Sequence, residues 1–144
     1  MKSIDTAGIE YRVPAEIPPG EVAELYVEAG WMTEPDAGEV RRMLQGTFAV
    51  SAAFHQGRLI GFMRAFSDGV SDAYLLDLVV RTEYRKLGIG RNILERLADY
   101  LRTLGIGWIL CIGAPGTAGF YARTGAKTMP DYIPYRFEPQ QGEG

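Results

Sequence analysis

The sequence contains one cysteine and one histidine, Cys111 and His55. A single cysteine excludes an internal disulfide, and these two residues cannot form the cysteine or histidine clusters that hold zinc. We therefore predict no metal site. No stretch reaches the ~20 apolar residues that a membrane-spanning helix needs, and the amino terminus lacks an apolar leader segment. These absences predict a cytoplasmic protein.

Positive charge is also scarce, because 15 Lys and Arg residues face 18 Asp and Glu residues, which gives a formal net charge of −3 with no basic block. Binding to nucleic acid depends mainly on neutralising phosphates, so we expect no nucleic-acid partner. Apolar residues make up 47% of the 144 residues, enough for a substantial core. We predict a single domain over residues 1–144, with a flexible tail at 138–144. Small molecules or peptides are the expected partners.

Hydrophobic periodicity and turn residues predict a mixed α/β protein without repeats or linkers. The expected strands cover residues 9–13, 47–54, 58–66, 74–80, a buried 108–112, and 132–137. The expected helices cover residues 22–29, 36–44, 89–104 and 120–123. The resulting order is β-α-α-β-β-β-α-β-α-β. We expect His55 to be exposed at a hairpin tip and Cys111 to lie in the core.

The most informative segment joins the strand at 74–80 to the long helix, and its sequence is Arg85-Lys-Leu-Gly88-Ile-Gly90. Glycine lets the backbone approach a ligand closely, and an apolar stripe at helical spacing begins at Ile89. The turn therefore lies at a helix N-terminus, where unpaired amides and the helix dipole attract anions such as a diphosphate. The segment lacks the three-glycine dinucleotide pattern and the Gly-Lys-Ser/Thr ending of a nucleotide P-loop, which disfavours NAD and ATP.

This Arg/Gln-x-x-Gly-x-Gly/Ala pattern is similar to the acetyl-CoA pyrophosphate loop of the GCN5-related N-acetyltransferase (GNAT) superfamily. The order of elements resembles that family along nearly the whole chain. The segment from Phe120 to Ala126 resembles the family's Phe-Tyr-x-x-x-Gly-Phe pattern, with Ala126 in place of the last aromatic residue. The resemblance implies the acyl-CoA N-acyltransferase fold, in which helices flank a central mixed, mostly antiparallel sheet. It also implies a homodimer, since family members often pair.

The same resemblance implies acetyl-CoA as cosubstrate and assigns the site residues. The backbone of Leu78, Val79 and Val80 would bind the pantetheine arm and polarise the thioester carbonyl. Tyr121 would protonate the departing CoA thiolate, because a phenol with a pKa of ~10 keeps its proton at neutral pH. The residues expected around the diphosphate are Arg85, Lys86, Leu87, Gly88, Ile89, Gly90, Arg91 and Asn92.

The acceptor amine must lose a proton before it attacks, because an ammonium group has no lone pair. Asp77 is the nearest carboxylate on the strand before the loop, and it is the predicted base. Asp68, Asp72 and Glu34 are alternatives, and a chain of water molecules is another.

The predicted function is an N-acetyltransferase that moves the acetyl group of acetyl-CoA to a primary amine by direct attack in a ternary complex. The alternative is a non-catalytic regulatory module of the same fold that binds CoA and a protein partner. The resemblance places the acceptor pocket near Trp31, Met32, Tyr132 and Tyr135, and aromatic and acidic groups suit a cationic amine. A polyamine, an amino acid, an aminoglycoside, and a protein lysine or N-terminus all remain open as acceptors.

Overall fold

A computed structural model describes residues 3–140 of the chain. The chain divides into two compact units, one that ends at Cys111 and one that begins at Ile112. Short 3-10 turns precede the first strand at Thr6–Gly8 and follow the fourth at Thr82–Tyr84. The strands and helices are β1 (Ile9–Arg12), α1 (Pro19–Glu28), α2 (Ala37–Gln45), β2 (Ala49–His55), β3 (Arg58–Ser67), β4 (Asp72–Val80), α3 (Ile89–Thr103), β5 (Trp108–Cys111) and α4 (Ala118–Ala122).

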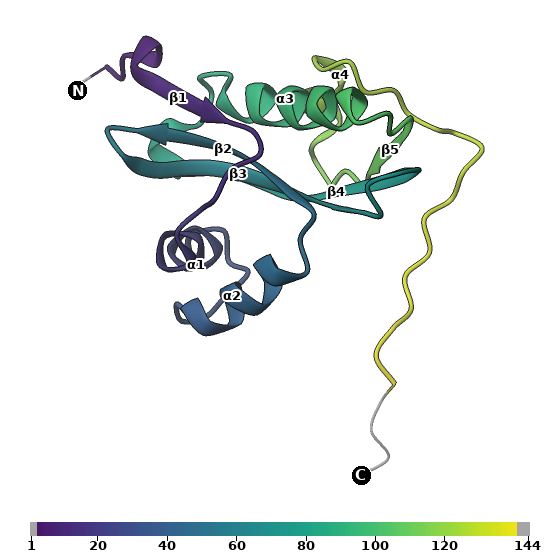
Figure 1. Ribbon diagram of the computed structural model, residues 1–144, viewed down its shortest axis with the longest axis horizontal. Coiled ribbons are helices and arrows are strands. Elements are labelled where there is room, and N and C mark those ends of the chain that lie inside the picture. The colour runs from purple at the N-terminus through teal and green to yellow at the C-terminus, as the bar shows by residue number, and fades with distance from the viewer. Residues whose placement is uncertain (1–2, 141–144) are drawn as a thin grey trace. The chain divides into compact units, whose positions relative to one another are not determined.

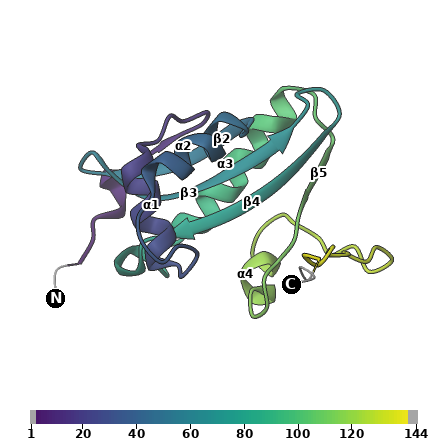
Figure 2. The ribbon, with the colours of Figure 1, turned by 90° about the horizontal axis from the view of Figure 1, so that it is seen from below.

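The first unit is built on a five-stranded sheet in the order β1-β2-β3-β4-β5. Neighbouring strands from β1 to β4 are antiparallel, and β4 pairs with β5 in parallel. The helices α1 and α2 lie on one face of this sheet and α3 lies on the other (Figures 1 and 2). The prediction of a mixed, mostly antiparallel sheet flanked by helices is therefore confirmed.

Local sequence accounts for the three long helices of this unit. Asp36 precedes α2 and its Oδ1 accepts a hydrogen bond from the Glu39 amide at 3.0 Å, as expected of a capping residue. Helix α1 ends before Gly30, whose φ of +80° suits glycine. Helix α3 buries an apolar stripe that includes Ile93, Leu97 and Leu101 against the sheet.

Three expectations about the first unit are wrong. The strand at 108–112 ends at Cys111, and it is half-buried with Trp108 44% exposed, because β5 stands at the edge of the sheet. Cys111 is accordingly half-buried rather than part of the core. His55 is not exposed, because its ring packs edge-on against Tyr84 and its Nδ1 lies 2.6 Å from the Tyr84 hydroxyl.

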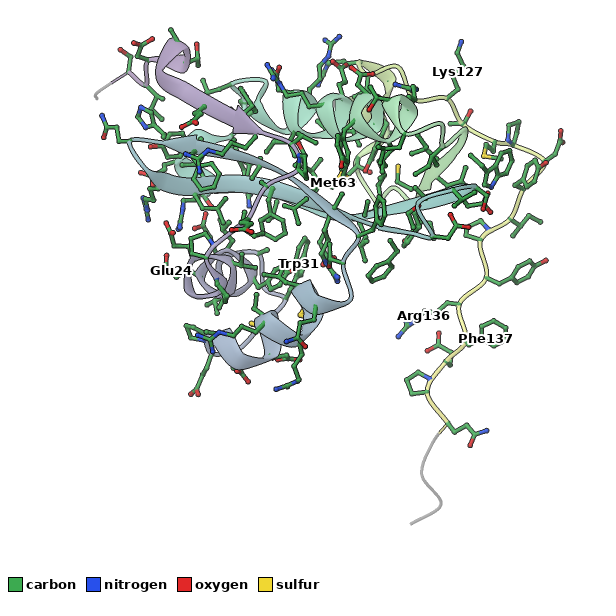
Figure 3. All side chains as sticks on the ribbon, viewed as in Figure 1. Glu24, Trp31, Met63, Lys127, Arg136 and Phe137 are labelled. Atoms are coloured by element: carbon green, nitrogen blue, oxygen red, sulfur yellow. The ribbon has the colours of Figure 1, made fainter. Side chains whose placement is uncertain are left out.

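The second unit holds α4 and a long segment without regular structure. The strand predicted at 132–137 does not form within residues 3–140, and Figure 3 shows Arg136 and Phe137 projecting from an irregular segment. Two prolines, Pro130 and Pro134, lack the amide hydrogen that a strand ladder needs, and the Tyr132 amide instead bonds the Met129 carbonyl in a turn. Of the predicted tail, 138–140 has no regular structure and 141–144 lies outside the described residues. The single-domain assignment stays a prediction.

None of the helices described in residues 3–140 has both the length and the apolar character that crossing a membrane requires. The same part of the chain contains no group of three or more His, Cys, Asp or Glu side chains that could hold a metal ion.

Candidate active site

A β-bulge interrupts β4 where it passes β3. Phe62 pairs with Val79 and Arg64 pairs with Leu76, so two steps along β3 correspond to three steps along β4. The extra residue is accommodated at Asp77, whose φ is +60°. Aspartate is one of the few non-glycine residues that tolerate this left-handed conformation. A bulge bends its strand and increases the local twist.

The two parallel strands separate just before this bulge. Pairing between β4 and β5 runs from Asp72 and Trp108 to Leu75 and Cys111, and it ends there. Within residues 3–140, no strand pairs with this edge of β4 beyond Leu75. The backbone of the predicted residues Leu78, Val79 and Val80 therefore lies along an open strand edge, which can offer its amides and carbonyls to an extended ligand.

The chain then turns into the N-terminus of α3. Lys86 and Gly88 have φ values of +64° and +80°, and left-handed residues of this kind turn successive amides toward one side, which favours anions. Gly88 is the N-cap, and nothing lies within 4 Å of the position that a Cβ would take there. No acidic residue lies in the first turn of α3 and no side chain caps it. The helix end is therefore accessible and suits an anion.

Two side chains near this loop donate hydrogen bonds to backbone carbonyls at its ends. Arg85 Nε donates to the Val80 carbonyl at 3.2 Å, and Asn92 Nδ2 donates to the Gly88 carbonyl at 3.0 Å. Arg91 pairs with Glu95 along the surface of α3 at 2.8 Å. Arg85, Lys86 and Leu87 are exposed, and Ile89 is buried. The bonds of Arg85 and Asn92 support the shape of the loop, and the Asn92 amide nitrogen is already used.

Asp77 is held by two partners from other elements. Its Oδ2 accepts hydrogen bonds from Arg64 Nε at 2.7 Å and from the Tyr26 hydroxyl at 2.9 Å. Arg64 is buried and also donates to Thr47 Oγ1 at 3.2 Å. Burial and the negative charge of Asp77 raise the pKa of Tyr26 well above its ordinary value, although Arg64 opposes the shift. These contacts favour a positioning role for Asp77 over the predicted role as base.

The other carboxylates considered as bases lie at the surface. Asp68 accepts hydrogen bonds from the Val70 amide and from the amide and hydroxyl of Ser71. Those bonds, led by that of the Ser71 hydroxyl, hold the pKa of Asp68 far below its usual range, so it is a poor proton acceptor at neutral pH. Asp72 and Glu34 are exposed.

Tyr121 belongs to the second unit, on α4. Its ring lies against the backbone of Gly113, where a Cβ would come within 3.3 Å of ring atom Cε2. Phe120 packs edge-on against it, with the ring centroids 5.1 Å apart. The Thr124 hydroxyl donates to the Tyr121 carbonyl at 2.7 Å, which closes the turn after α4. The ring is thus seated by its own unit, and its predicted role in proton transfer stays a prediction.

Sequence reasoning missed Arg64 and Tyr26. Tyr26 lies in the helix expected at 22–29, where nothing in the neighbouring residues links its hydroxyl to a distant carboxylate. Arg64 carried a stronger signal, because a charged residue inside the run from Leu59 to Phe66 must be buried with a partner. The sequence does not say which carboxylate that partner is.

Comparisons with known proteins identify the family. The sequence model of the Acetyltransferase (GNAT) family matches residues 14–126. The chain is 34% identical over 118 residues to serotonin N-acetyltransferase 2, a chloroplastic protein of Oryza sativa subsp. japonica, and this alignment covers 79% of the chain and 58% of that protein. It is 33% identical over 100 residues to the chloroplastic GCN5-related N-acetyltransferase 1 of Arabidopsis thaliana, covering 68% of the chain and 51% of that protein. The chain thus spans just over half the length of these relatives.

A solved structure shows the same fold. The GNAT family acetyltransferase of Streptococcus pneumoniae TIGR4 matches with a TM-score of 0.73 at 18% identity, covering 92% of the chain and 99% of that protein. The family match extends over most of the chain and includes β4, the glycine turn and α3. The chain therefore belongs to the GNAT family of acetyltransferases.

Proposed function

We propose that the protein transfers the acetyl group of acetyl-CoA to a primary amine. The observation that carries this proposal is the continuous stretch of backbone from the open edge of β4 to the N-terminus of α3. Acetyl-CoA carries its thioester and its diphosphate at opposite ends of an extended arm. An extended strand edge followed by an anion-binding helix end fits that molecule, and the open space at Gly88 lets the backbone approach the phosphates.

Acetyl-CoA supplies an activated acetyl group, and the protein supplies position and polarity. The turn from Arg85 to Gly90 and the first turn of α3 bind the diphosphate. The backbone of Leu78–Val80 binds the arm, and an amide of this stretch polarises the thioester carbonyl. Tyr121 holds a proton for the departing thiolate. Asp77 is engaged by Arg64, and Asp68 already accepts three hydrogen bonds. We therefore propose that the amine loses its proton to water.

The acceptor that we propose is an amine joined to an aromatic ring by a short alkyl chain. Trp31 is 52% exposed and its ring lies 5.6 Å from that of Tyr26, the residue that binds Asp77. Figure 3 shows Trp31 on the side of the sheet where α1 and α2 lie. Phe66 and Tyr74 are paired across β3 and β4 and are also exposed. Exposed rings next to the bulge suit stacking with an aromatic amine. The rice relative, whose name gives serotonin as its substrate, supports the same class.

Binding and turnover test the proposal separately. Acetyl-CoA and CoA should raise the melting temperature, whereas NAD and ATP should not. Release of CoA should then be followed with tryptamine, serotonin, spermidine, an aminoglycoside and a lysine peptide. We expect the highest kcat/KM with the two aromatic amines. A higher value with spermidine would refute the acceptor class, and no thermal shift with acetyl-CoA would refute the cosubstrate.

The regulatory alternative predicts a thermal shift without turnover of any amine, so the same pair of measurements separates it from catalysis. The homodimer and the cytoplasmic location stay predictions. Sedimentation of the purified protein tests the first of these.

A further inference from the structure

The contacts of Asp77 and Arg64 join α1, the loop before β2, β3 and β4 at the point where β4 bulges. Tyr26 comes from α1, Thr47 precedes β2, Arg64 lies on β3 and Asp77 lies on β4. The Arg64 side chain is 8% exposed and that of Asp77 is 25% exposed, so this ion pair is shielded from water. Ion pairs in such surroundings are screened far less than surface pairs.

The backbone conformation at Asp77 needs these contacts. A left-handed residue with a side chain persists only where the surrounding structure determines it. Arg64 pairs with Leu76 across the strands and reaches Asp77 through its side chain, so it spans the bulge. Tyr26 comes from α1, and its ring packs against those of Trp31 and Phe62, at centroid distances of 5.6 and 5.7 Å. Both donors are buried, so the surrounding packing restrains their side chains.

We infer that Arg64 and Tyr26 clamp Asp77 so that the bulge holds the backbone from Leu78 onward in position to polarise the thioester carbonyl. Asp77 is thus a positioning residue, and it acts through the strand rather than by accepting a proton. The inference rests on the proposed function, because it concerns how the acetyl group of acetyl-CoA is held.

The same contacts argue against Asp77 as the base. Both donors bind the same oxygen, Oδ2, and one of them is a buried guanidinium. Removal of the Asp77 charge would leave the buried charge of Arg64 without its counter-charge, which is costly. The raised pKa of Tyr26 agrees with this arrangement, because a hydroxyl that donates to a charged carboxylate keeps its proton.

Two conservative variants test the inference. Asp77→Asn keeps a residue that tolerates the left-handed conformation but removes the charge. Tyr26→Phe removes only the hydroxyl and keeps the ring packed between Trp31 and Phe62. Asp99→Asn is the matched control, because Asp99 forms an exposed ion pair with Arg102 near the end of α3, away from the site.

The main readout is the ¹³C chemical shift of the carbonyl in bound [1-¹³C]acetyl-CoA, which moves away from its free value when the carbonyl is polarised. We expect this shift to return toward the free value in both variants and to stay unchanged in Asp99→Asn. The affinity for CoA, measured by calorimetry, should change less than about twofold, because the diphosphate loop is intact. The kcat should fall by about 10- to 100-fold, less than the loss of a whole oxyanion donor. The kcat–pH profile should keep its shape.

The opposite pattern would overturn the inference. If Asp77→Asn removed the acidic limb of the kcat–pH profile while the carbonyl shift stayed at its wild-type value, Asp77 would be the base. A wild-type shift in Tyr26→Phe together with unchanged kcat would also refute the clamp. Failure of the wild-type protein to bind acetyl-CoA is a different result, because it would refute the proposed function itself and the inference with it.

Discussion

Replacement of Gly61 by alanine should disturb the candidate site from the opposite strand. Gly61 lies on β3 and pairs with Val80 of β4. An added Cβ would come within 2.8 Å of the Val79 carbonyl oxygen, 3.0 Å of Ile93 Cδ1 and 3.2 Å of Val80 Cγ2. Ordinary contact begins near 3.4 Å, so β4 must move by about 0.6 Å, because the atom in its way belongs to the backbone. The part of β4 that moves is the part that should hold the thioester.

Overpacking of this kind costs about 1 to 3 kcal/mol in the free energy of unfolding. A loss of about 2 kcal/mol lowers the melting temperature by about 6 °C in a chain of this size. Since misplacement of reacting groups by ~1 Å can cost ~100-fold in rate, we expect kcat/KM for acetyl-CoA to fall about tenfold.

Urea unfolding and steady-state kinetics measure the two effects of Gly61→Ala. Gly107→Ala is the matched control, because nothing lies within 4 Å of its added Cβ and its φ is not positive. The opposite result is that Gly61→Ala matches the control in both its unfolding midpoint and its kcat/KM. That result would show that β3 and β4 accommodate the added methyl group without cost. The reasoning would then be wrong.

Three further changes test other parts of the molecule. Ser51→Ala should raise the free energy of unfolding by about 1 kcal/mol, because the Ser51 hydroxyl is buried without a hydrogen-bond partner in residues 3–140; a lower urea midpoint would contradict this. Gly90→Glu should abolish CoA binding in calorimetry, since it places a negative side chain at the N-terminus of α3. Unchanged affinity would show that the diphosphate does not bind at this turn. Tyr121→Phe should lower kcat with little change in acetyl-CoA affinity, because the hydroxyl acts in proton transfer. Wild-type turnover would show that Tyr121 serves only in packing.

The parts of the structure that could be predicted are those encoded by neighbouring residues. The start of α3 at Ile89 follows from the apolar stripe and the glycine before it, and the capping bond between Asp36 and Glu39 spans three residues. Such signals are local, because a turn or a helix cap is stabilised by side chains within a few positions. The glycine turn was found for the same reason.

The parts that could not be predicted depend on contacts between distant segments. Asp77 receives its hydrogen bonds from residues 13 and 51 positions away, and no local pattern reports those partners. The bulge itself depends on the register between β3 and β4, which periodicity alone does not specify. The strand expected at 132–137 also depends on a distant partner, because a strand forms only where another strand accepts its ladder, and Pro130 and Pro134 lack the amide hydrogens that such a ladder uses.

The surfaces proposed for acetyl-CoA and for the amine also differ in whether neighbouring or distant segments of the chain form them. The surface proposed for acetyl-CoA runs without interruption from Leu78 to the N-terminus of α3, so one strand, one turn and one helix form it, while β3 and α1 support the bulge from behind. The surface proposed for the amine combines Trp31, which follows α1, with Phe66 on β3 and Tyr74 on β4. Substitutions at those rings need not displace the cofactor surface, because they lie on side chains rather than on the backbone that binds the arm. Recognition of the amine can therefore change while acetyl-CoA binding is retained, and the contacts of Asp77 are where the two surfaces meet.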